Sequence, residues 1–256
     1  MNSSQRAQYR KSSKLIEWMD AKLYPDQGDN WDDEMFRTTI LEHLDESAQI
    51  LDLGAGSGHV SQMDFRGMAA RVCGVDSDDS VLGNPFLDEG RIGQGDSIPY
   101  ADGSFDVVFA DNFLEHLEKP LDVFREIYRV LKPGGFFVTK TPNKWHYAPV
   151  LARFTPYWFH VAVNRLRGRS REHTFPTWYR ANTPGEIRGF ASESGLEISN
   201  INLVEGRPEY MRICAPTYLM GWIYERCVNL IPGGSRFRVI MIATMQKPGS
   251  EAVGDA

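Results

Sequence analysis

The sequence predicts an α/β fold in which a mostly parallel sheet carries helices on both faces. Short, continuously apolar runs alternate with segments of helical periodicity, a pattern typical of strands that are buried on both sides. A glycine-rich loop directly follows the first of these runs. Acidic residues stand at the ends of successive runs, where the carboxyl ends of parallel strands meet along one edge.

Length and composition limit the classes of protein to consider. The 256 residues fit one large domain or a domain with a small cap, and 42% hydrophobic residues supply a sizeable core. A charged fraction of 24% and a mean hydropathy of -0.38 exclude collagen-like, coiled-coil and wholly disordered chains. The net charge of -6 argues against nucleic-acid binding by bulk electrostatics.

Cysteine usage and apolar patterning bear on location. The three cysteines are widely spaced and form no CxxC pair, which fits a reducing cytosol and removes the usual zinc-ribbon spacings. No run of 18 uncharged apolar residues and no N-terminal apolar signal region are present. We therefore expect a cytoplasmic protein, with contact at a membrane surface as an alternative.

The first 47 residues predict helices. Residues 4–23 form an amphipathic pattern with Leu15, Trp18, Met19 and Leu23 on one face. A second helix is expected over about 33–46, after a turn in residues 25–30.

The next hundred residues alternate strands and helices. Strands are expected at Ile50–Leu53, Arg71–Val75, Phe105–Ala110 and Phe136–Thr141. A helix over 58–68 should follow the first strand. Another should begin at Pro120, where the missing N–H costs nothing, and stop at the Lys-Pro-Gly-Gly of residues 132–135.

The glycine loop reads LDLGAGSGH, with Asp52 two residues before Gly54. Glycines between a strand and a helix permit a tight turn and a close approach of the backbone to a ligand. The amino end of the expected helix would add N–H donors. A dinucleotide fingerprint requires a third glycine at position 59, where this chain has His59.

More polar residues follow other strands of the expected sheet. Asp76 closes the second strand, and its carboxylate can accept hydrogen bonds from two ribose hydroxyls. Asp96 and Ser97 precede the Phe105 strand, and Asp111 ends it. All of them should meet the glycine loop at one edge of the sheet.

At this point the sequence resembles the class I S-adenosylmethionine-dependent methyltransferases. Their successive motifs correspond to LDLGAGSG, GVDSD, GDSIPYADGSFDVVFADNFLEHL and VLKPGGFFVTKTPN, in order and at compatible spacing. The resemblance is strong over residues 48–142 and weak over 181–246. It implies a Rossmann-like sheet of seven strands with an antiparallel last strand, for which Phe237–Met245 is suited.

The resemblance also implies roles for individual residues. S-adenosyl-L-methionine would be the cofactor and S-adenosyl-L-homocysteine the product. The methionine part would lie against Asp52 and the loop backbone, the ribose against Asp76, the adenine between Asp96 and Ser97, and the methionine amine against backbone at Ala110 or Asp111. The full set of expected cofactor-binding residues is Asp52, Gly54, Ala55, Gly56, Gly58, Asp76, Ser77, Asp96, Ser97, Ala110 and Asp111.

Residues 143–180 have an unusual composition. They hold seven Lys or Arg against one acidic residue, and nine aromatic residues. One interpretation is a cap that recognises an anionic methyl acceptor, such as a phosphate or lipid head group, through Arg165, Arg169 and His173. The alternative is an aromatic mini-core with solvated arginines. Nucleic acid is disfavoured, because the rest of the chain is acidic.

The expected organisation follows from these segments. It comprises an N-terminal helical segment (1–47), the Rossmann-like core (48–142), the cap (143–180), a C-terminal part of the core (181–246) with a helical insertion at about 208–232, and a tail (247–256). Within the insertion, Tyr218–Ile231 predicts an apolar helix for the core or for a membrane surface.

The predicted reaction is methyl transfer to a small molecule, possible at oxygen, nitrogen or carbon, with oxygen favoured. A general base would be needed for oxygen or nitrogen, and His116, His146, His160 and His173 are candidates, with Tyr147 as a positioning hydroxyl. Of these, His116, His146 and Tyr147 are our catalytic assignment. No metal-ligand pattern is visible, so metal-independent transfer is expected. A nicotinamide-dependent oxidoreductase and a non-catalytic cofactor-binding protein remain alternatives.

Overall fold

The computed structural model describes residues 13–154 and 176–249. The chain divides into two compact units. The sheet unit has its described residues at 31–142, 177–202 and 240–249. The helical unit has them at 13–30, 143–154, 176 and 203–239.

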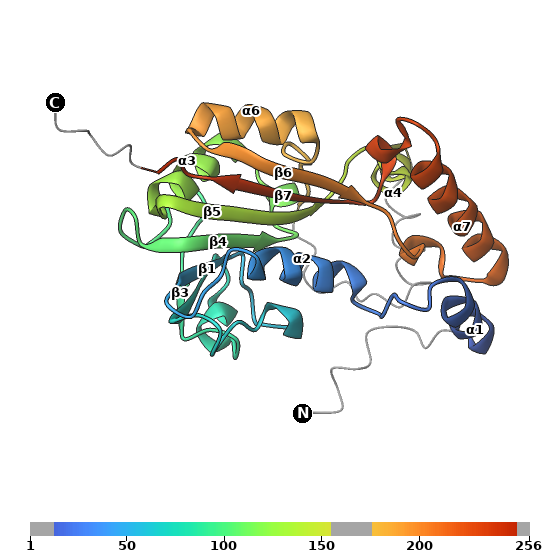
Figure 1. The fold of residues 1–256 in the computed structure, drawn as a ribbon, viewed down its shortest axis with the longest axis horizontal. Helices are drawn as coiled ribbons and strands as arrows, with labels where there is room; N and C mark the ends of the chain where they lie inside the picture. Colours follow the sequence, from blue (N-terminus) through green and yellow to red (C-terminus); the bar gives the residue numbers. More distant parts are fainter. Residues whose placement is uncertain (1–12, 155–175, 250–256) are drawn as a thin grey trace. The chain divides into compact units, whose positions relative to one another are not determined.

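The sheet confirms the predicted fold class. Within the described residues, seven strands lie in the order β3-β2-β1-β4-β5-β7-β6 (Figure 1). The first five strands pair in parallel, and β7 pairs antiparallel with β5. The strands are β1 Gln49–Leu53, β2 Arg71–Asp76, β3 Glu89–Ile92, β4 Phe105–Asp111, β5 Leu131–Pro142, β6 Glu197–Val204 and β7 Ile240–Gln246.

Helices cover opposite faces of this sheet. The helices of the sheet unit are α2 Trp31–Leu41, α3 Pro120–Val130 and α6 Pro184–Ser194. Phe124 of α3 packs edge-on against Phe137 of β5, with ring centroids 5.8 Å apart. Phe36 of α2 packs against Phe109 of β4, at 6.3 Å. Phe137 is the register partner of Val108 and lies on the same face of the sheet as Val108. Because successive side chains of a strand point to opposite faces, Phe109 lies on the other face. α3 and α2 therefore cover opposite faces of the sheet.

The sequence explains why α3 forms as predicted. Pro120 occupies the first turn, where no N–H is required, and every third or fourth residue after it is apolar. The buried side chains of this helix are Pro120, Val123, Phe124, Ile127 and Val130. α6 pairs with α3 through Phe190 and Phe124, whose ring centroids are 5.7 Å apart.

The predicted helix over 58–68 is wrong. Only one short 3-10 turn, η2 Ser61–Met63, forms there. Arg37 of α2 donates hydrogen bonds to the carbonyls of Gln62 and Asp64, which a helix would need for itself. Asp64 also accepts from the backbone N–H of Arg66. The glycine loop is therefore not followed by the amino end of an α-helix.

Several boundaries differ from expectation. β3 was not predicted, because it is a four-residue edge strand with two exposed residues and no apolar run. β5 begins at Leu131, before the Gly134-Gly135 pair, and β7 begins at Ile240 rather than 237, since residues Gly234–Phe237 form the 3-10 turn η6. α2 starts at Trp31 and ends at Leu41, short of residue 46.

In its described residues, the helical unit contains α1 Lys14–Leu23, α4 Tyr147–Phe154 and α7 Ala215–Leu230, with the 3-10 turns η5 Glu209–Met211 and η6. Ile16, Met19 and Tyr24 pack with the fully buried Tyr218 of α7. The predicted buried face of the first helix is partly wrong, because Leu15 and Trp18 are 53% and 59% exposed. No helix among the described residues has the length and apolar character needed to cross a membrane.

A buried ammonium joins three elements of the sheet unit. The side chain of Lys140, on β5, is 0% exposed. Its Nζ lies 3.1 Å from Asp111 Oδ1 at the end of β4 and 3.2 Å from Asp32 Oδ2 in the first turn of α2. Asp33 Oδ1 also accepts a hydrogen bond from it. The carboxylates compensate the cost of burying the cation and hold α2 to the sheet.

We predict that Lys140→Ala destabilises the protein by about 3–5 kcal/mol, because it leaves buried carboxylates without a cation. The measurement is urea unfolding at neutral pH. Lys132→Ala is the control. It removes the Lys132–Asp106 pair (2.7 Å), whose side chains are 39% and 36% exposed, and should cost about 0.2–1 kcal/mol. Equal losses in the two variants would contradict this assignment.

Candidate functional site

The glycine loop closes over the end of β2. The backbone N–H groups of Gly54 and Ala55 donate to Val75 O at 2.8 and 3.3 Å. Gly54, Gly56 and Gly58 have φ of +84°, +49° and +74°, which glycine adopts without strain. The amide of Asn84 donates to Ala55 O and Gly56 O and holds the loop from outside. The loop is thus a fixed backbone cradle at the carboxyl edge of the sheet.

Asp76 lies next to this cradle. Its Oδ2 accepts from Gly56 N at 2.8 Å, and its Oδ1 accepts from Asp78 N at 2.9 Å. The neighbouring Ser77 is exposed. Each carboxylate oxygen can accept a further hydrogen bond, so Asp76 is available to a ligand that offers hydroxyl groups.

The carboxyl groups of Asp111 and Asp76 act on the buried carboxyl group of Asp52. Asp52 is buried, and burial raises its pKa well above the ordinary value, with further contributions from the charges of Asp111 and Asp76. Burial also raises the pKa of Asp111 to about 6, although Lys140 opposes the shift. A ligand with positive charge would relieve the repulsion at this edge.

Phe113 is a residue of this site that sequence reasoning missed. A Cβ on Gly54 would lie 2.7 Å from Phe113 Cδ2, and a Cβ on Gly95 would lie 2.8 Å from Phe113 Cζ. One ring thus touches both the glycine loop and the loop of Asp96. Asn112, directly before it, has φ +48°, a left-handed conformation that is uncommon for a residue other than glycine. The sequence offered one signal for this contact, which is that both residues against the Phe113 ring, Gly54 and Gly95, are glycines.

The sheet unit therefore brings the predicted cofactor residues to one edge. Asp76 and Asp111 are the last residues of β2 and β4, and Asp52 is the last but one of β1, the strand between them. Ala110 is buried within β4. Asp96 and Ser97 are exposed in the loop after β3.

A turn after β4 carries another cluster. The buried carboxylate of Glu115 accepts from Thr141 Oγ1 at 3.0 Å, and Asn182 Nδ2 donates to the same hydroxyl at 2.7 Å. Glu115 O accepts from the backbone N–H groups of Trp178 and Tyr179. His116 lies in the same turn, η4 Leu114–His116, and is half-buried. The last residues of the cap segment, together with Asn182 just after it, are thereby attached beside the end of β4.

His146 and Tyr147 lie in the helical unit. His146 is 1% exposed, and its Nδ1 accepts from Ala148 N at 3.3 Å, which places the ring proton on Nε2. That Nε2 is 3.7 Å from Glu205 Oε2, and neither atom has a hydrogen-bond partner among the described residues. The rings of Tyr147, Tyr210 and Tyr224 lie 4.0, 5.6 and 5.5 Å from the His146 ring, centroid to centroid.

Burial shifts both members of this pair toward their neutral forms. It lowers the pKa of His146 to about 3 and raises the pKa of Glu205 to about 8. The position of His146 does not fit a base that touches an acceptor, because the ring is buried and its one lone pair is engaged. Glu205, distant in sequence from His146, was not predicted.

Two further expectations concern the residues of the cap segment and metal binding. Arg165, Arg169, His173 and His160 lie outside the described residues. Among the residues that the structure does describe, no three His, Cys, Asp or Glu side chains are grouped to hold a metal ion.

Comparisons with known proteins agree with this geometry. Residues 51–139 match the family model described as a methyltransferase domain. A probable S-adenosylmethionine-dependent methyltransferase of Mycolicibacterium smegmatis is 33% identical over 121 residues, which are 45% of this chain and 46% of that protein. A ubiquinone biosynthesis O-methyltransferase of Pseudomonas aeruginosa is 28% identical over 169 residues, 60% of this chain and 66% of that protein. The chain thus spans about half to two thirds of the length of these relatives.

Solved structures show the same fold. A putative sarcosine dimethylglycine methyltransferase from Galdieria sulphuraria aligns with a TM-score of 0.54 and 19% identity, covering 93% of this chain and 92% of that one. The geranyl diphosphate C-methyltransferase of Streptomyces coelicolor, solved with Mg²⁺, geranyl diphosphate and S-adenosyl-L-homocysteine, aligns with a TM-score of 0.54 and 18% identity, covering 93% and 85%.

The His146–Glu205 pair predicts a stability optimum on the acid side of neutrality. Glu205, whose folded pKa is raised from 4.5 to about 8, contributes stability that is lost as the pH rises between these values. His146, lowered from 6.5 to about 3, contributes stability that is lost as the pH falls between these values. Between pH 4.5 and 6.5 the two groups change the stability in opposite directions, so their contributions cancel.

Melting temperatures across this pH range test the pair. Glu205→Gln should reduce the loss of stability between about pH 6.5 and 8 and keep the acid limb. The buried Asp52, whose pKa is also raised, should account for a loss that remains. Glu17→Gln, on the exposed side of α1, should leave both limbs as in the wild type. An alkaline limb as steep in Glu205→Gln as in the wild type would show that Glu205 does not contribute to the loss of stability.

Proposed function

The chain belongs to the class I S-adenosylmethionine-dependent methyltransferases, and we propose on this premise that it transfers a methyl group from S-adenosyl-L-methionine to a small-molecule acceptor. One observation carries the proposal. The carboxyl edge of the sheet unit joins a backbone cradle to three carboxyl groups, those of Asp76 and Asp111 and that of Asp52, on which the other two act. This arrangement favours a ligand with a cationic centre and hydroxyl groups.

The residues present fit this cofactor. The cradle needs glycine, because a Cβ at Gly54 would meet Phe113 and a Cβ at Gly58 would meet Asn84. We assign the methionine part to Asp52, to the backbone of Gly54, Ala55, Gly56 and Gly58, and to Ala110 and Asp111. Asp76 and Ser77 take the ribose, and Asp96 and Ser97 take the adenine. Asp52 and Asp111 face the ammonium and sulfonium charges.

The cofactor, when bound, supplies an activated methyl group on a sulfonium, so the protein's task is alignment and exclusion of water. Asp111 and Asp52 orient the charged end, while Asp76 fixes the ribose. His116, in the turn after β4, is the base we favour for an acceptor hydroxyl. We assign Tyr147 a positioning role, and the buried, neutral His146 supports its ring.

The acceptor is a small molecule, and we favour methylation at oxygen. The ubiquinone biosynthesis O-methyltransferase among the relatives is compatible with this. The charge of residues 143–180 supports an anionic acceptor, bound through Arg165, Arg169 and His173. We propose a cytoplasmic location, with transient contact at a membrane surface if the acceptor is lipid-linked.

The direct test of function uses labelled S-adenosyl-L-methionine. The protein is incubated with the labelled cofactor and a host extract, and the labelled product is identified. Transfer of label to a small molecule is the expected outcome. Tight binding of the cofactor without turnover across acceptor classes would indicate a non-catalytic binding protein, and binding of NAD in its place would indicate an oxidoreductase.

We predict that Asp76→Ala weakens S-adenosyl-L-methionine binding by about 1–3 kcal/mol, or roughly ten- to a hundredfold, because ribose hydrogen bonds are lost. Gly56→Val should weaken it further by placing a side chain in the cradle. Calorimetry measures both. Asp79→Ala, an exposed acid three residues away, is the control and should bind normally. Unchanged affinity in Asp76→Ala would remove Asp76 from the site.

The cap is tested with the acceptor found by labelling. Replacing Arg165, Arg167, Arg169 and Arg171 together with glutamine should raise the acceptor KM strongly and leave cofactor affinity unchanged. The salt dependence of KM should weaken as well, since salt screens exposed charges. A native acceptor KM combined with lost cofactor binding would contradict the assignment. Lost binding to anionic liposomes would instead indicate a membrane-docking role.

A further inference from the structure

The loop that carries Asp96 and Ser97 is shaped by a tight turn. Ser97 N donates to Gln94 O at 3.1 Å, and the side chains of Asp96 and Ser97 remain exposed. Gly95 lies against the Phe113 ring, so the turn is supported on its inner side. An exposed carboxylate on a supported turn meets a ligand at a lower entropic cost if the rest of the loop is fixed as well.

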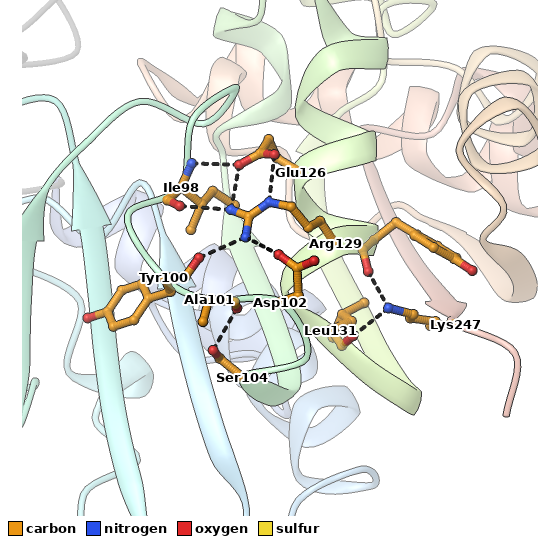
Figure 2. Close-up of polar contacts among 10 residues, drawn as sticks. Ile98, Tyr100, Ala101, Asp102, Ser104, Glu126, Arg129, Leu131 and Lys247 are labelled. Carbon is orange, nitrogen blue, oxygen red and sulfur yellow. Dashed lines mark hydrogen bonds and ion pairs between the residues drawn. The ribbon is translucent and has the colours of Figure 1, made fainter. Parts of the chain in front are cut away.

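Two side chains of α3 fix the residue that follows this turn. Glu126 Oε2 accepts from Ile98 N at 2.9 Å, and Arg129 Nη2 donates to Ile98 O at 2.9 Å (Figure 2). Arg129 Nη1 donates to Tyr100 O and to Asp102 Oδ1, both at 2.8 Å. The loop is thus held at the backbone N–H and carbonyl of Ile98, at the carbonyl of Tyr100 and at the side chain of Asp102.

Every N–H of the Arg129 guanidinium is used in this arrangement. Its Nε and Nη2 donate to the two oxygens of Glu126 at 2.8 and 2.7 Å, in addition to the bonds to Ile98, Tyr100 and Asp102. Hydrogen bonding to Arg129 lowers the pKa of Glu126, which therefore stays ionised and accepts from Ile98. A lysine ammonium has three donors on one atom and cannot span these partners.

We propose that Glu126 and Arg129 are positioning residues that fix the base specificity of the cofactor site through the loop of Asp96 and Ser97. This inference rests on the proposed function, which places the adenine at these two residues. Neither α3 residue touches the cofactor in this account. A loop that is already held loses little conformational freedom when the ligand binds, whereas a released loop would lose more and bind less selectively.

The test compares S-adenosyl-L-homocysteine with its deaminated analogue, S-inosyl-L-homocysteine, by calorimetry. In Arg129→Lys we expect binding of S-adenosyl-L-homocysteine to weaken about tenfold and the preference for adenine over hypoxanthine to fall, since the loop is released. The preference between bases is a readout that a loss of stability alone does not move. Melting temperatures are recorded for every variant, and binding is measured well below them.

Arg125→Gln is the matched control, because it removes an exposed ion pair with Asp122 (3.7 Å) from the same helix. It should keep wild-type affinity and wild-type base preference. Lower stability of Arg129→Lys with unchanged affinity and preference would overturn the inference and leave the proposed function intact. If Arg129→Lys does not fold, Glu126→Gln removes fewer bonds and should lower the same preference. A wild-type protein that binds neither analogue would overturn both proposals.

Discussion

The ion pairs of the buried Lys140 ammonium are the interaction on which the electrostatics of the carboxyl edge of the sheet depend. A fully buried cation is stable only with anions around it, and here they come from Asp111 on β4 and from Asp32 and Asp33 on α2. The same contacts hold the first turn of α2 to the sheet. They also oppose the rise in the pKa of Asp111, whose charge in turn acts on Asp52. One lysine therefore links the helix that covers the sheet, α2, to the electrostatics of the carboxyl edge.

This edge combines a rigid backbone with an excess of acidic groups. The glycine loop is held by Asn84 and by the strand beside it, and the Phe113 ring fills the space that side chains at Gly54 and Gly95 would need. Rigid surroundings and like charges together favour a cationic ligand that arrives with its own hydroxyl donors. Methyl transfer removes the sulfonium charge, so the same electrostatics should favour the substrate form of the cofactor over its product.

The parts of the fold that sequence reasoning predicted are those with strong local signals. Ile50–Leu53 and Phe105–Ala110 are apolar except for one aspartate each, and such short apolar runs are typical of buried parallel strands. The helix expected over 58–68 failed because Arg37, distant in sequence, takes the carbonyls that a helix needs. The edge strand β3 lacks an apolar run. Lys140 and Glu205 were missed since their partners come from other elements, and no local pattern marks such pairs.

Amide hydrogen exchange with and without S-adenosyl-L-homocysteine tests the central claim most directly, because it locates the bound cofactor on the chain. The account predicts slower exchange on binding in the glycine loop from Gly54 to Gly58, in residues 76–78, and in the loop of Asp96 and Ser97. α1 and α7 of the helical unit should exchange as before. Binding that slows exchange in the helical unit and leaves these three segments unchanged would contradict it.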